Sequence, residues 1–487
     1  MALCFAVLGQ TTYTVVQVQE YSRHGVRTAK TYFPNPLNDT EKNLGINTLT
    51  PNGYRQQYMI GQEVRKRYPS VFDTQFSFRN VEVFSSPEVR TQVSVWSQLT
   101  SILPFGSGSN ITGRLEDSLP QFDSIVQKMD GTYALPEGFS AFPIKVESWE
   151  LDFLFFPSEG VSSCPKAAAW FKTFKNAQYK KYDSFVTDTA SKLEALGYNS
   201  STTFKVQKWD LSSLGSFYSE LQAKWNYYGK QTETNISEEL IEKLKLMQSL
   251  KFAVEFNDPT VRKMRNSGIA RSIIKAMDTF INGTASDKIR FRLFGGHDTG
   301  LQPHGMSLGT TSVDCIVDKI QGNKNTNMCE PAPPFSSAFF YELAVDSSNK
   351  YHARILYNGK KVPICSATEE SPSSDGYCPY ETFKKIYEEK MYMDVNDFDE
   401  YCGNKMIQNK RSIEEKRSSQ RIFTSSNRNV WIVYFLLVAT TVVVIAWRCF
   451  VIRSKIRKEV EQYNKIHGTG AADSSIEHET LKAEEKQ

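Results

Sequence analysis

Two segments of this chain each read as a buried strand that ends in a polar turn, and this pair constrains the fold more than any other feature. TYTVVQVQEYSRHG (residues 12–25) is rich in Val and ends at Arg23, His24 and Gly25. IRFRLFGGHD (Ile289 to Asp298) is largely apolar up to two glycines and ends in a His-Asp pair. In α/β folds, ligand-binding groups lie at the carboxyl ends of strands. The sequence therefore predicts an α/β fold in which these two strand ends carry the chemistry.

Other segments supply the helices and further strands of such a fold. Thr50-Pro51 is typical of a helix N-cap followed by Pro at the first helical position, and apolar residues then recur at helical spacing. VEVFSS (Val81 to Ser86) predicts a short strand that leads into a helix. AFFYELAV (Ala338 to Val345) and YHARILYNG (Tyr351 to Gly359) predict a terminal hairpin.

The middle of the chain has a mainly helical pattern. Val186, Ala190 and Leu193 recur at helical spacing before Gly197, and a second such pattern follows Ser237. The predicted fold is a three-layer α/β/α core sheet with a mainly helical cap domain, plus one C-terminal transmembrane helix. The expected organisation is a signal-peptide-like segment at 1–12, the α/β core at 13–147 and 281–402, the cap at 148–280, a stalk at 403–429, the transmembrane helix at 430–452 and a cytoplasmic tail at 453–487.

Apolar segments near both ends of the chain point to a membrane system. MALCFAVLGQTT is apolar but lacks a basic start, so it reads as a truncated signal peptide; the alternative is a first buried strand that runs on from Met1. Val430 to Trp447 is 18 residues long without a charge, and a helix of that length can cross a bilayer core of about 30 Å. Lys and Arg are equally frequent on its two sides, so the positive-inside rule does not orient it.

Cysteines and glycosylation motifs do orient this predicted helix. Six cysteines lie between the two apolar segments: Cys164, Cys315, Cys329, Cys365, Cys378 and Cys402. Five Asn-x-Ser/Thr motifs lie in the same region, at Asn38, Asn110, Asn199, Asn235 and Asn282. An even set of six cysteines suits three disulfides, and Asn-linked glycans are added only in the secretory pathway. The alternative is that the six cysteines are reduced thiols in a cytosolic protein. We therefore expect the residues before Val430 on the lumenal or external side.

Composition and spacing argue against other functional classes. The formal net charge of +4 is small for 487 residues and the aromatic residues are scattered, so nucleic-acid binding is not expected. The sequence has no ligand cluster with the spacing of a metal site, so we expect neither a metal nor another cofactor.

The residues at the first strand end suit phosphoryl chemistry. In the motif RHGVR, which begins at Arg23, two guanidiniums flank one imidazole, and Arg binds phosphate oxygens bidentately without losing its charge. A neutral His is a competent nucleophile toward phosphorus, and Gly25 would remove side-chain bulk where an oxyanion approaches. The alternative is that both arginines are surface cations beside an incidental histidine. His297 and Asp298 add a donor and a carboxyl group at the equivalent end of the second strand.

The two motifs together resemble a known family. RHGVRTA and GGHDTG, in that order and about 270 residues apart, resemble the two signatures of the histidine acid phosphatases, branch 2 of the histidine phosphatase superfamily. Three further stretches resemble segments of that family: LTPNGYRQQYMIGQEVRKRY from Leu49, SSPEVRTQVSVWSQL from Ser85, and VESWELDFLFFPSEGVSSCP from Val146. The likeness extends from about Val15 to Cys402.

The resemblance implies a role for each candidate residue. His24 would form a phosphohistidine, and Asp298 would protonate the leaving group. The phosphoryl oxygens would be held by four side chains: Arg23, Arg27, Arg90 and His297. Since a free Asp has a pKa of about 3.9, the resemblance also implies an acid optimum.

The chain departs from the family pattern at one position. Where the family usually has Pro, two residues after the second Arg of the motif, this chain has Ala29, and Lys30 follows it near the expected substrate entrance. By analogy with the family, the disulfides would be Cys164 with Cys402, Cys315 with Cys329, and Cys365 with Cys378.

These features predict hydrolysis of phosphate monoesters by a single-pass membrane protein of the lysosome, the endosome or the cell surface. The alternatives are a phytase-like inositol polyphosphate phosphatase, and a catalytically silent receptor that binds anions through the same pocket. In the tail, Tyr463 and Ile466 form a Tyr-x-x-apolar motif similar to signals that bind sorting adaptors, and Cys449 is a palmitoylation candidate. A homodimer is compatible with the sequence, which does not determine the oligomeric state.

Overall fold

The computed structural model describes most of the chain between residues 12 and 392 and a short segment near the C-terminus. The described residues are 12–30, 43–72, 80–113, 132–148, 152, 154–155, 173, 177–204, 206, 208–229, 231, 235–284, 288–323, 328–365, 374–392, 447–448, 450–462 and 465. Two compact units are distinguished, 1–407 and 408–487, and the second contains a helix over 450–462. In these described ranges no helix is long and apolar enough to cross a bilayer. Residues 1–11 of the predicted signal segment and 430–446 of the predicted membrane span lie outside the described residues.

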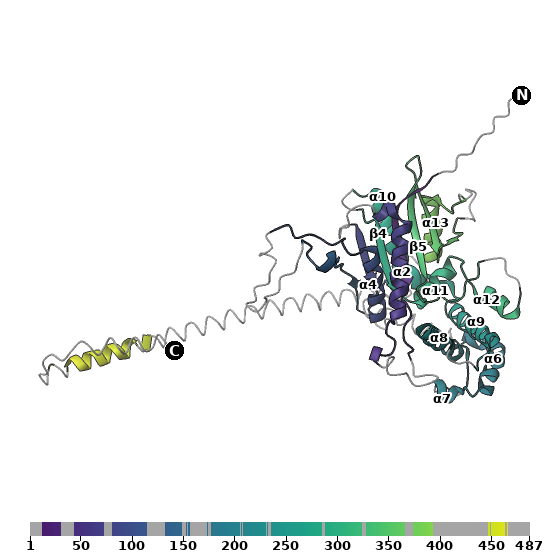
Figure 1. Ribbon diagram of the computed structural model, residues 1–487, viewed down its shortest axis with the longest axis horizontal. Helices are drawn as coiled ribbons and strands as arrows, with labels where there is room; N and C mark the ends of the chain where they lie inside the picture. Colours follow the sequence, from purple (N-terminus) through teal and green to yellow (C-terminus); the bar gives the residue numbers. More distant parts are fainter. Residues whose placement is uncertain are drawn as a thin grey trace, which may run out of the picture. The chain divides into compact units, whose positions relative to one another are not determined.

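A mixed β-sheet forms the centre of the first unit (Figure 1). Its described strands follow the order β3 (Lys145–Val146), β2 (Val81–Ser85), β4 (Phe291–Gly296), β1 (Thr14–Arg23), β5 (Ala338–Val345), β6 (Tyr351–Tyr357) and β7 (Lys360–Val362), with β8 (Cys378–Pro379) paired to β6. The strands from β3 to β1 are parallel, and β5, β6 and β7 are antiparallel to their neighbours. The two predicted strand ends and the predicted hairpin of β5 and β6 are confirmed.

β1 and β4 lie side by side in the middle of this sheet. Their parallel register runs from Val18 opposite Phe291 to Arg23 opposite Gly296. The backbone N–H of His24 then donates to the carbonyl oxygen of Gly296, at 3.1 Å. Both strands are covered on two faces, which explains the apolar residues of β4, and the polar side chains of Gln17, Gln19 and Glu20 in β1 are buried as well. Because parallel strands end at the same edge, the residues that follow β1 and β4 meet there.

Helices α2 (Pro51–Arg67) and α4 (Val89–Ile102) cover one face of the sheet, and they pack against each other. The core beneath them includes Val64, Leu99 and Leu293, one from each helix and one from β4. α2 begins where the sequence predicted, and α4 follows β2 as the sequence predicted.

Helices α10 (Pro259–Asn282), α11 (Asp298–Ser307) and α13 (Tyr380–Met391) pack on the other side of the sheet. Ile273 and Met277 of α10 share a hydrophobic core with residues of β1, β4 and β5. Most of α10 falls in the range expected to form the cap, but it packs on the sheet. Helical periodicity identifies a buried face without telling which element covers it, and this explains the difference.

A further group of helices lies at one end of the sheet (Figure 1). α6 (Asp183–Ala195), α8 (Leu211–Tyr228), α9 (Glu238–Glu255) and α12 (Val313–Gln321) share a second hydrophobic core. The remaining short helices are α3 (Pro69–Phe72), η2 (Pro136–Gly138), η3 (Lys180–Tyr182) and α7 (Ser200–Phe204). α8 and α9 are the elements of this group that face the end of β1.

The loop after β1 packs directly on the first turn of α2. Thr50 caps that turn by accepting a hydrogen bond from the N–H of Gly53, at 3.1 Å. A Cβ on Gly25 would lie 2.5 Å from the carbonyl oxygen of Gly53, and a Cβ on Gly53 would lie 2.2 Å from that of Val26. The space beside Gly25 is therefore filled by α2. The expectation that Gly25 makes room for an oxyanion is wrong, because its missing side chain makes room for a helix backbone.

Gly25→Ala should consequently destabilise the fold. The new methyl group must push the loop away from α2, and overpacking of this kind costs about 1–3 kcal/mol. The measurement is the free energy of unfolding in urea. Gly113→Ala is the matched control, because a Cβ there meets no described atom within 4 Å. Equal losses in the two variants would contradict this account of Gly25.

Candidate active site

All six predicted site residues line one cavity of about 430 Å³ at the shared edge of β1 and β4. They are Arg23, His24, Arg27, Arg90, His297 and Asp298. The strand ends supply one cluster, the first turn of α4 supplies Arg90, and α11 begins at Asp298. The sequence therefore identified the wall of the cavity that the sheet provides.

His24 is held in one tautomer. Its Nδ1 lies 2.8 Å from the carbonyl oxygen of Gly25. A carbonyl only accepts hydrogen bonds, so Nδ1 must carry the proton and Nε2 must carry the lone pair. The residue is 3 % exposed, and its backbone is fixed by the bonds to Gly296 and from the N–H of Ser336.

The surroundings of His24 keep its imidazole neutral. Burial lowers its pKa well below the usual 6.5, and the nearby positive charges of Arg23 and Arg90 lower this pKa further. A protonated imidazole has no lone pair to attack with, so this environment preserves the nucleophilic form at acid pH.

Each of the three arginines lies beside a carboxylate. The pairs are Arg23 with Asp298 at 2.8 Å, Arg27 with Glu220 at 3.5 Å, and Arg90 with Glu88. Arg23 also donates to the carbonyl oxygen of Pro333 and lies over the ring of Phe335, 4.1 Å from its centroid. Buried charges need such partners. The three planar donor groups are thus held at fixed positions around one cavity, as the binding of a phosphoryl group requires.

His297 bridges Arg90 and the end of β2. Its Nδ1 lies 3.4 Å from Nη2 of Arg90, and its Nε2 lies 2.8 Å from the hydroxyl of Ser86. Since a guanidinium only donates, this Nδ1 is an acceptor and Nε2 carries the proton. Burial lowers the pKa of His297 well below 6.5, and Arg90 adds to this effect. A direct bond from Nδ1 to a phosphoryl oxygen would require that nitrogen to gain a proton.

Asp298 is held as a carboxylate by the cations around it. Burial by itself would raise its pKa, but the charges of Arg23 and Lys30 outweigh burial and lower the pKa to about 2. Its Oδ1 accepts a bond from the N–H of Thr299, at 2.9 Å. Asp298 can therefore act as a proton donor only after an anion has offset these positive charges.

Helices α8 and α9 form the opposite wall, with Glu220 on the first and Lys251 and Phe252 on the second. A Cβ on Gly215 would lie 2.8 Å from Cδ of Lys251, so the lysine stem passes over this glycine. Sequence reasoning missed Glu220 and Lys251, because helical periodicity does not show which residues face a distant strand end. Ser86 was also missed, although it directly follows β2, just as His24 directly follows β1. A position after a strand end is the signal that could have identified it.

The other predicted sites have different outcomes. The structure contains the disulfides Cys315–Cys329 and Cys365–Cys378, as the resemblance implied. The sequon residues Asn110, Asn199, Asn235 and Asn282 are exposed, and their glycosylation stays a prediction. Several predicted sites lie outside the described residues: Cys164, Cys402, Asn38, Cys449, Tyr463 and Ile466. No three His, Cys, Asp or Glu side chains gather in a metal-binding arrangement in the described part of the chain.

Sequence comparisons connect this site to a known family. A family model described as the histidine phosphatase superfamily (branch 2) matches residues 14–358. A Caenorhabditis elegans protein assigned as acid phosphatase 5 is 24% identical over 315 residues, which are 61% of this chain and 62% of that protein. Human lysosomal acid phosphatase is 34% identical over 83 residues, 17% of this chain and 20% of that protein. The matches thus cover less than two thirds of the length of these relatives.

Solved structures share the fold. The phytase of Klebsiella sp. ASR1 superimposes with a TM-score of 0.54 at 13% identity, covering 79% of this chain and 98% of that one. The phytase of Citrobacter braakii gives a TM-score of 0.52 at 15% identity, and the match covers 80% of this chain and 99% of that one. At these identities the likeness concerns the fold alone.

Asp298→Asn should make the stability of the chain less dependent on pH. The variant leaves the buried Arg23 without its charged partner, so at pH 7 it should be less stable by about 1.5–3 kcal/mol. Folding lowers the pKa of Asp298 from 3.8 to about 2. The carboxylate therefore stabilises the fold fully when the pH is above 3.8, and this stabilisation is lost as the pH falls through about 2. The difference between the two proteins in urea unfolding should shrink over this window. A constant difference would contradict the ion pair.

Proposed function

The chain belongs to branch 2 of the histidine phosphatase superfamily, and we propose that it is an acid phosphatase that hydrolyses phosphate monoesters through a phosphohistidine at His24. One observation carries the proposal: His24, with its lone pair on Nε2, lines the same cavity as Asp298 and three guanidiniums. The cavity therefore combines a nucleophile, an anion-binding cluster and a proton donor, which displacement at phosphorus requires.

In the first step, the ester phosphate binds among Arg23, Arg27 and Arg90. The lone pair of His24 Nε2 forms a bond to phosphorus while the bond from phosphorus to the ester oxygen breaks. Asp298 gives its proton to that departing oxygen, so an alcohol leaves. The guanidiniums stabilise the charge on the phosphoryl oxygens throughout, and their existing contacts mean that little reorganisation is needed.

The proton on Asp298 depends on the substrate. With Arg23 and Lys30 beside it, its pKa is held at about 2. A bound phosphate dianion takes over these positive charges, and a carboxylate next to an anion gains proton affinity. Substrate binding therefore raises the pKa of Asp298 and prepares the acid.

In the second step, water attacks the phosphorus of the phosphohistidine. Asp298, now a carboxylate, accepts a proton from the water as the bond from phosphorus to Nε2 breaks. Inorganic phosphate leaves, and His24 returns to its neutral form. Because the pKa of His24 lies well below 6.5, the released imidazole stays unprotonated at acid pH and can attack again.

Turnover of two esters tests these roles. His24→Ala should abolish hydrolysis of p-nitrophenyl phosphate and glycerol 2-phosphate between pH 3 and 8, whereas His352→Ala, outside the cavity, should not.

Asp298→Asn should lower kcat for glycerol 2-phosphate by about 10²–10⁴-fold. The loss should be much smaller for p-nitrophenyl phosphate, because its leaving group needs no proton. Activity of the parent should fall as the pH rises and deprotonates Asp298 in the complex. Full activity of His24→Ala would rule out the nucleophile, and phosphate binding without any trapped phosphohistidine would favour a silent receptor.

One feature favours a second candidate, a phytase-like activity on polyphosphorylated rings. Lys30 and Lys251 line the same cavity from two different elements, beyond the arginines. Two further cations suit a substrate that carries more than one phosphate. Besides Asp298, three carboxylates line the cavity, Glu88, Glu220 and Glu255, and they limit its net positive charge. For this reason we place simple monoesters before phytate as the substrate.

Lys251→Gln distinguishes the two candidates. If the lysine contacts a second phosphate, the variant should raise KM for phytate about fivefold, the worth of one partly exposed ion pair, and leave KM for p-nitrophenyl phosphate unchanged. Lys245→Gln, on the exposed side of the same helix, is the control. An equal rise of KM for both substrates would mean that Lys251 only supports the site.

A further inference from the structure

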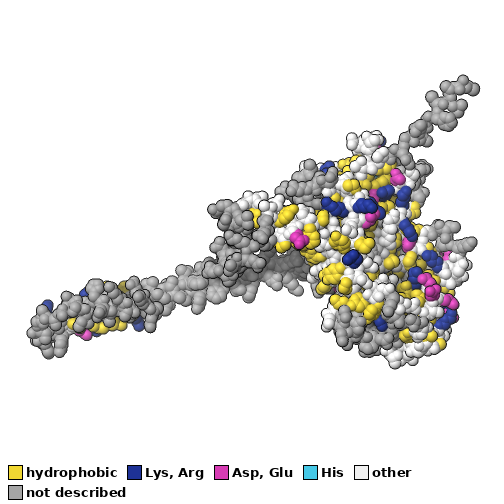
Figure 2. All heavy atoms as spheres, viewed as in Figure 1, with side chains coloured by type: hydrophobic (Ala, Val, Ile, Leu, Met, Phe, Trp, Pro, Cys, Tyr) yellow, Lys and Arg dark blue, Asp and Glu magenta, His cyan; other side chains and the backbone are white. Residues whose placement is uncertain are grey.

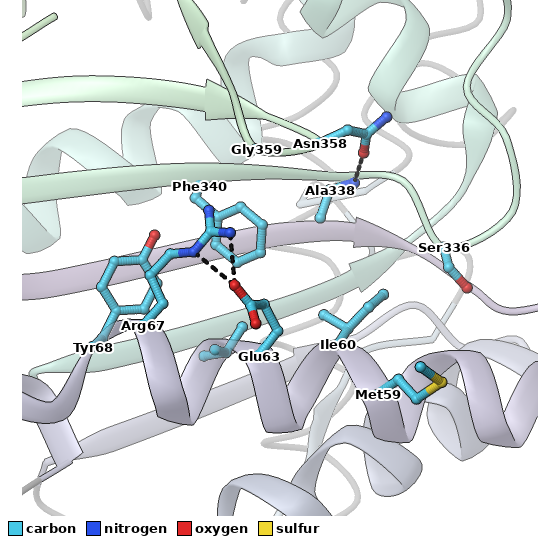
Figure 3. A pocket seen from close by; sticks show the side chains of 11 residues that line it. Met59, Ile60, Glu63, Arg67, Tyr68, Ser336, Ala338, Phe340, Asn358 and Gly359 are labelled. Atoms are coloured by element: carbon cyan, nitrogen blue, oxygen red, sulfur yellow. Dashed lines mark hydrogen bonds and ion pairs between the residues drawn. The ribbon is translucent and has the colours of Figure 1, made fainter. Parts of the chain in front are cut away.

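A second cavity, of about 300 Å³, lies between α2, the strand β5 and the turn that follows β6. It shares no lining residue with the cavity around His24. Figure 3 shows Ile60, Glu63 and Arg67 of the helix opposite Ala338 and Phe340 of β5. Its volume falls at the lower end of the range for small-molecule sites, roughly 300–1,000 Å³.

The lining of this cavity defines one class of ligand. Ile60, Val64 and Phe340 make its floor apolar. At the rim, Arg67 uses Nε and Nη2 to bind the same oxygen of Glu63, at 3.3 and 2.8 Å, as Figure 3 shows. A guanidinium has five N–H donors, so Nη1 can still bind an anion. The chemistry therefore suits a small molecule with an apolar body and one anionic group.

The outer face of α2 is also partly apolar. Tyr54, Tyr58 and Met59 are 45%, 38% and 59% exposed. Figure 2 shows hydrophobic side chains among Lys and Arg side chains on the side of the molecule where Figure 1 places α2. An amphipathic anion thus meets both kinds of surface as it approaches the cavity.

One lining residue, Ser336, touches the loop that carries His24. Ser336 has a left-handed backbone, with φ of 65°. Its N–H donates to the carbonyl oxygen of His24, at 3.1 Å. Its hydroxyl accepts a bond from Nε2 of Gln57 at 2.9 Å, and the same nitrogen donates to the carbonyl oxygen of Arg23 at 3.0 Å. Ser336, directly and through Gln57, therefore holds the peptide groups on both sides of the His24 α-carbon.

Helix α2 provides a second connection. Gln56 accepts bonds from the hydroxyl of Ser336 and from the N–H of Val26, both at 3.1 Å. Gln56 and Gln57 lie one turn before Ile60 on the same helix. A ligand that moves this helix or Ser336 by a fraction of an ångström must also move the loop between Arg23 and Val26, because packed groups shift together.

We propose that this cavity binds a small molecule with an apolar body and one anionic group, and that its occupancy changes the phosphate affinity of the other cavity through Ser336. The two sites are distinct, and the connection is a chain of hydrogen bonds rather than a shared residue. Because binding free energies are coupled reciprocally, phosphate must change the affinity for the second ligand by the same factor.

Hexanoate is a suitable probe for the binding half of the proposal. Calorimetry with the purified full-length chain should detect one hexanoate site, and 1-hexanol and hexylamine should bind more weakly. Arg67→Gln should weaken hexanoate binding about three- to fivefold, whereas Lys66→Gln, the neighbouring cation on α2 outside the cavity, should not. Ile60→Trp, which fills the cavity, should abolish binding. Unchanged binding in Ile60→Trp would overturn the proposal.

Phosphate affinity tests the coupling half without requiring turnover. Saturating hexanoate should change the Kd for phosphate by about fivefold or more, and phosphate should change the hexanoate Kd equally. Ser336→Gly keeps the left-handed backbone and the N–H bond to His24 but removes the hydroxyl bonds to Gln56 and Gln57, so it should bind hexanoate and show weaker coupling. Complete displacement of hexanoate by phosphate would place the probe in the phosphate cavity and overturn the proposal. Coupling of unchanged size in Ser336→Gly would overturn the part assigned to the Ser336 hydroxyl.

Discussion

The parallel pairing of β1 with β4 is the constraint on which the site depends. It brings the peptide after Arg23 against Gly296, so His24 and His297 occupy the same sheet edge. On the other side of β1, antiparallel β5 starts at this edge, and the residue before it, Ser337, accepts a bond from the N–H of Arg23. Backbone hydrogen bonds to residues at the ends of two neighbouring strands thus fix the loop that carries His24. The side chains of Arg23 and His24 are positioned by this fixed backbone.

Charge balance is the second constraint, because guanidiniums are costly to bury alone. Pairing each arginine with a carboxylate makes burial tolerable, and two of these carboxylates come from segments that follow neither β1 nor β4: Glu88 lies just before α4 and Glu220 lies on α8. The third is Asp298, which the fold uses both as a counter-ion and as the acid. An incoming phosphate competes for the same arginines, so anion binding and proton affinity are linked by electrostatics rather than by movement.

Features set by short stretches of chain could be predicted from the sequence, and features set by distant contacts could not. The Val-rich run before Arg23 and the Thr50-Pro51 start of α2 depend on local patterns, and both were confirmed. The reason for Gly25 lies in α2, and the position of Glu220 depends on how α8 docks. No period or motif encodes such docking. The family resemblance supplied what local patterns lacked, namely Arg90.

The order of strands in the sheet also bears on how the protein is made. Both neighbours of β1 come from the second half of the chain, since β4 begins at Phe291 and β5 at Ala338. At roughly 5–20 residues per second, a ribosome needs on the order of tens of seconds to add the first of them. During this time β1 has no neighbouring strand for its backbone hydrogen bonds, a state that favours aggregation and contact with chaperones. A nascent chain that stops before β4 would contain the nucleophile motif yet no sheet edge to hold it.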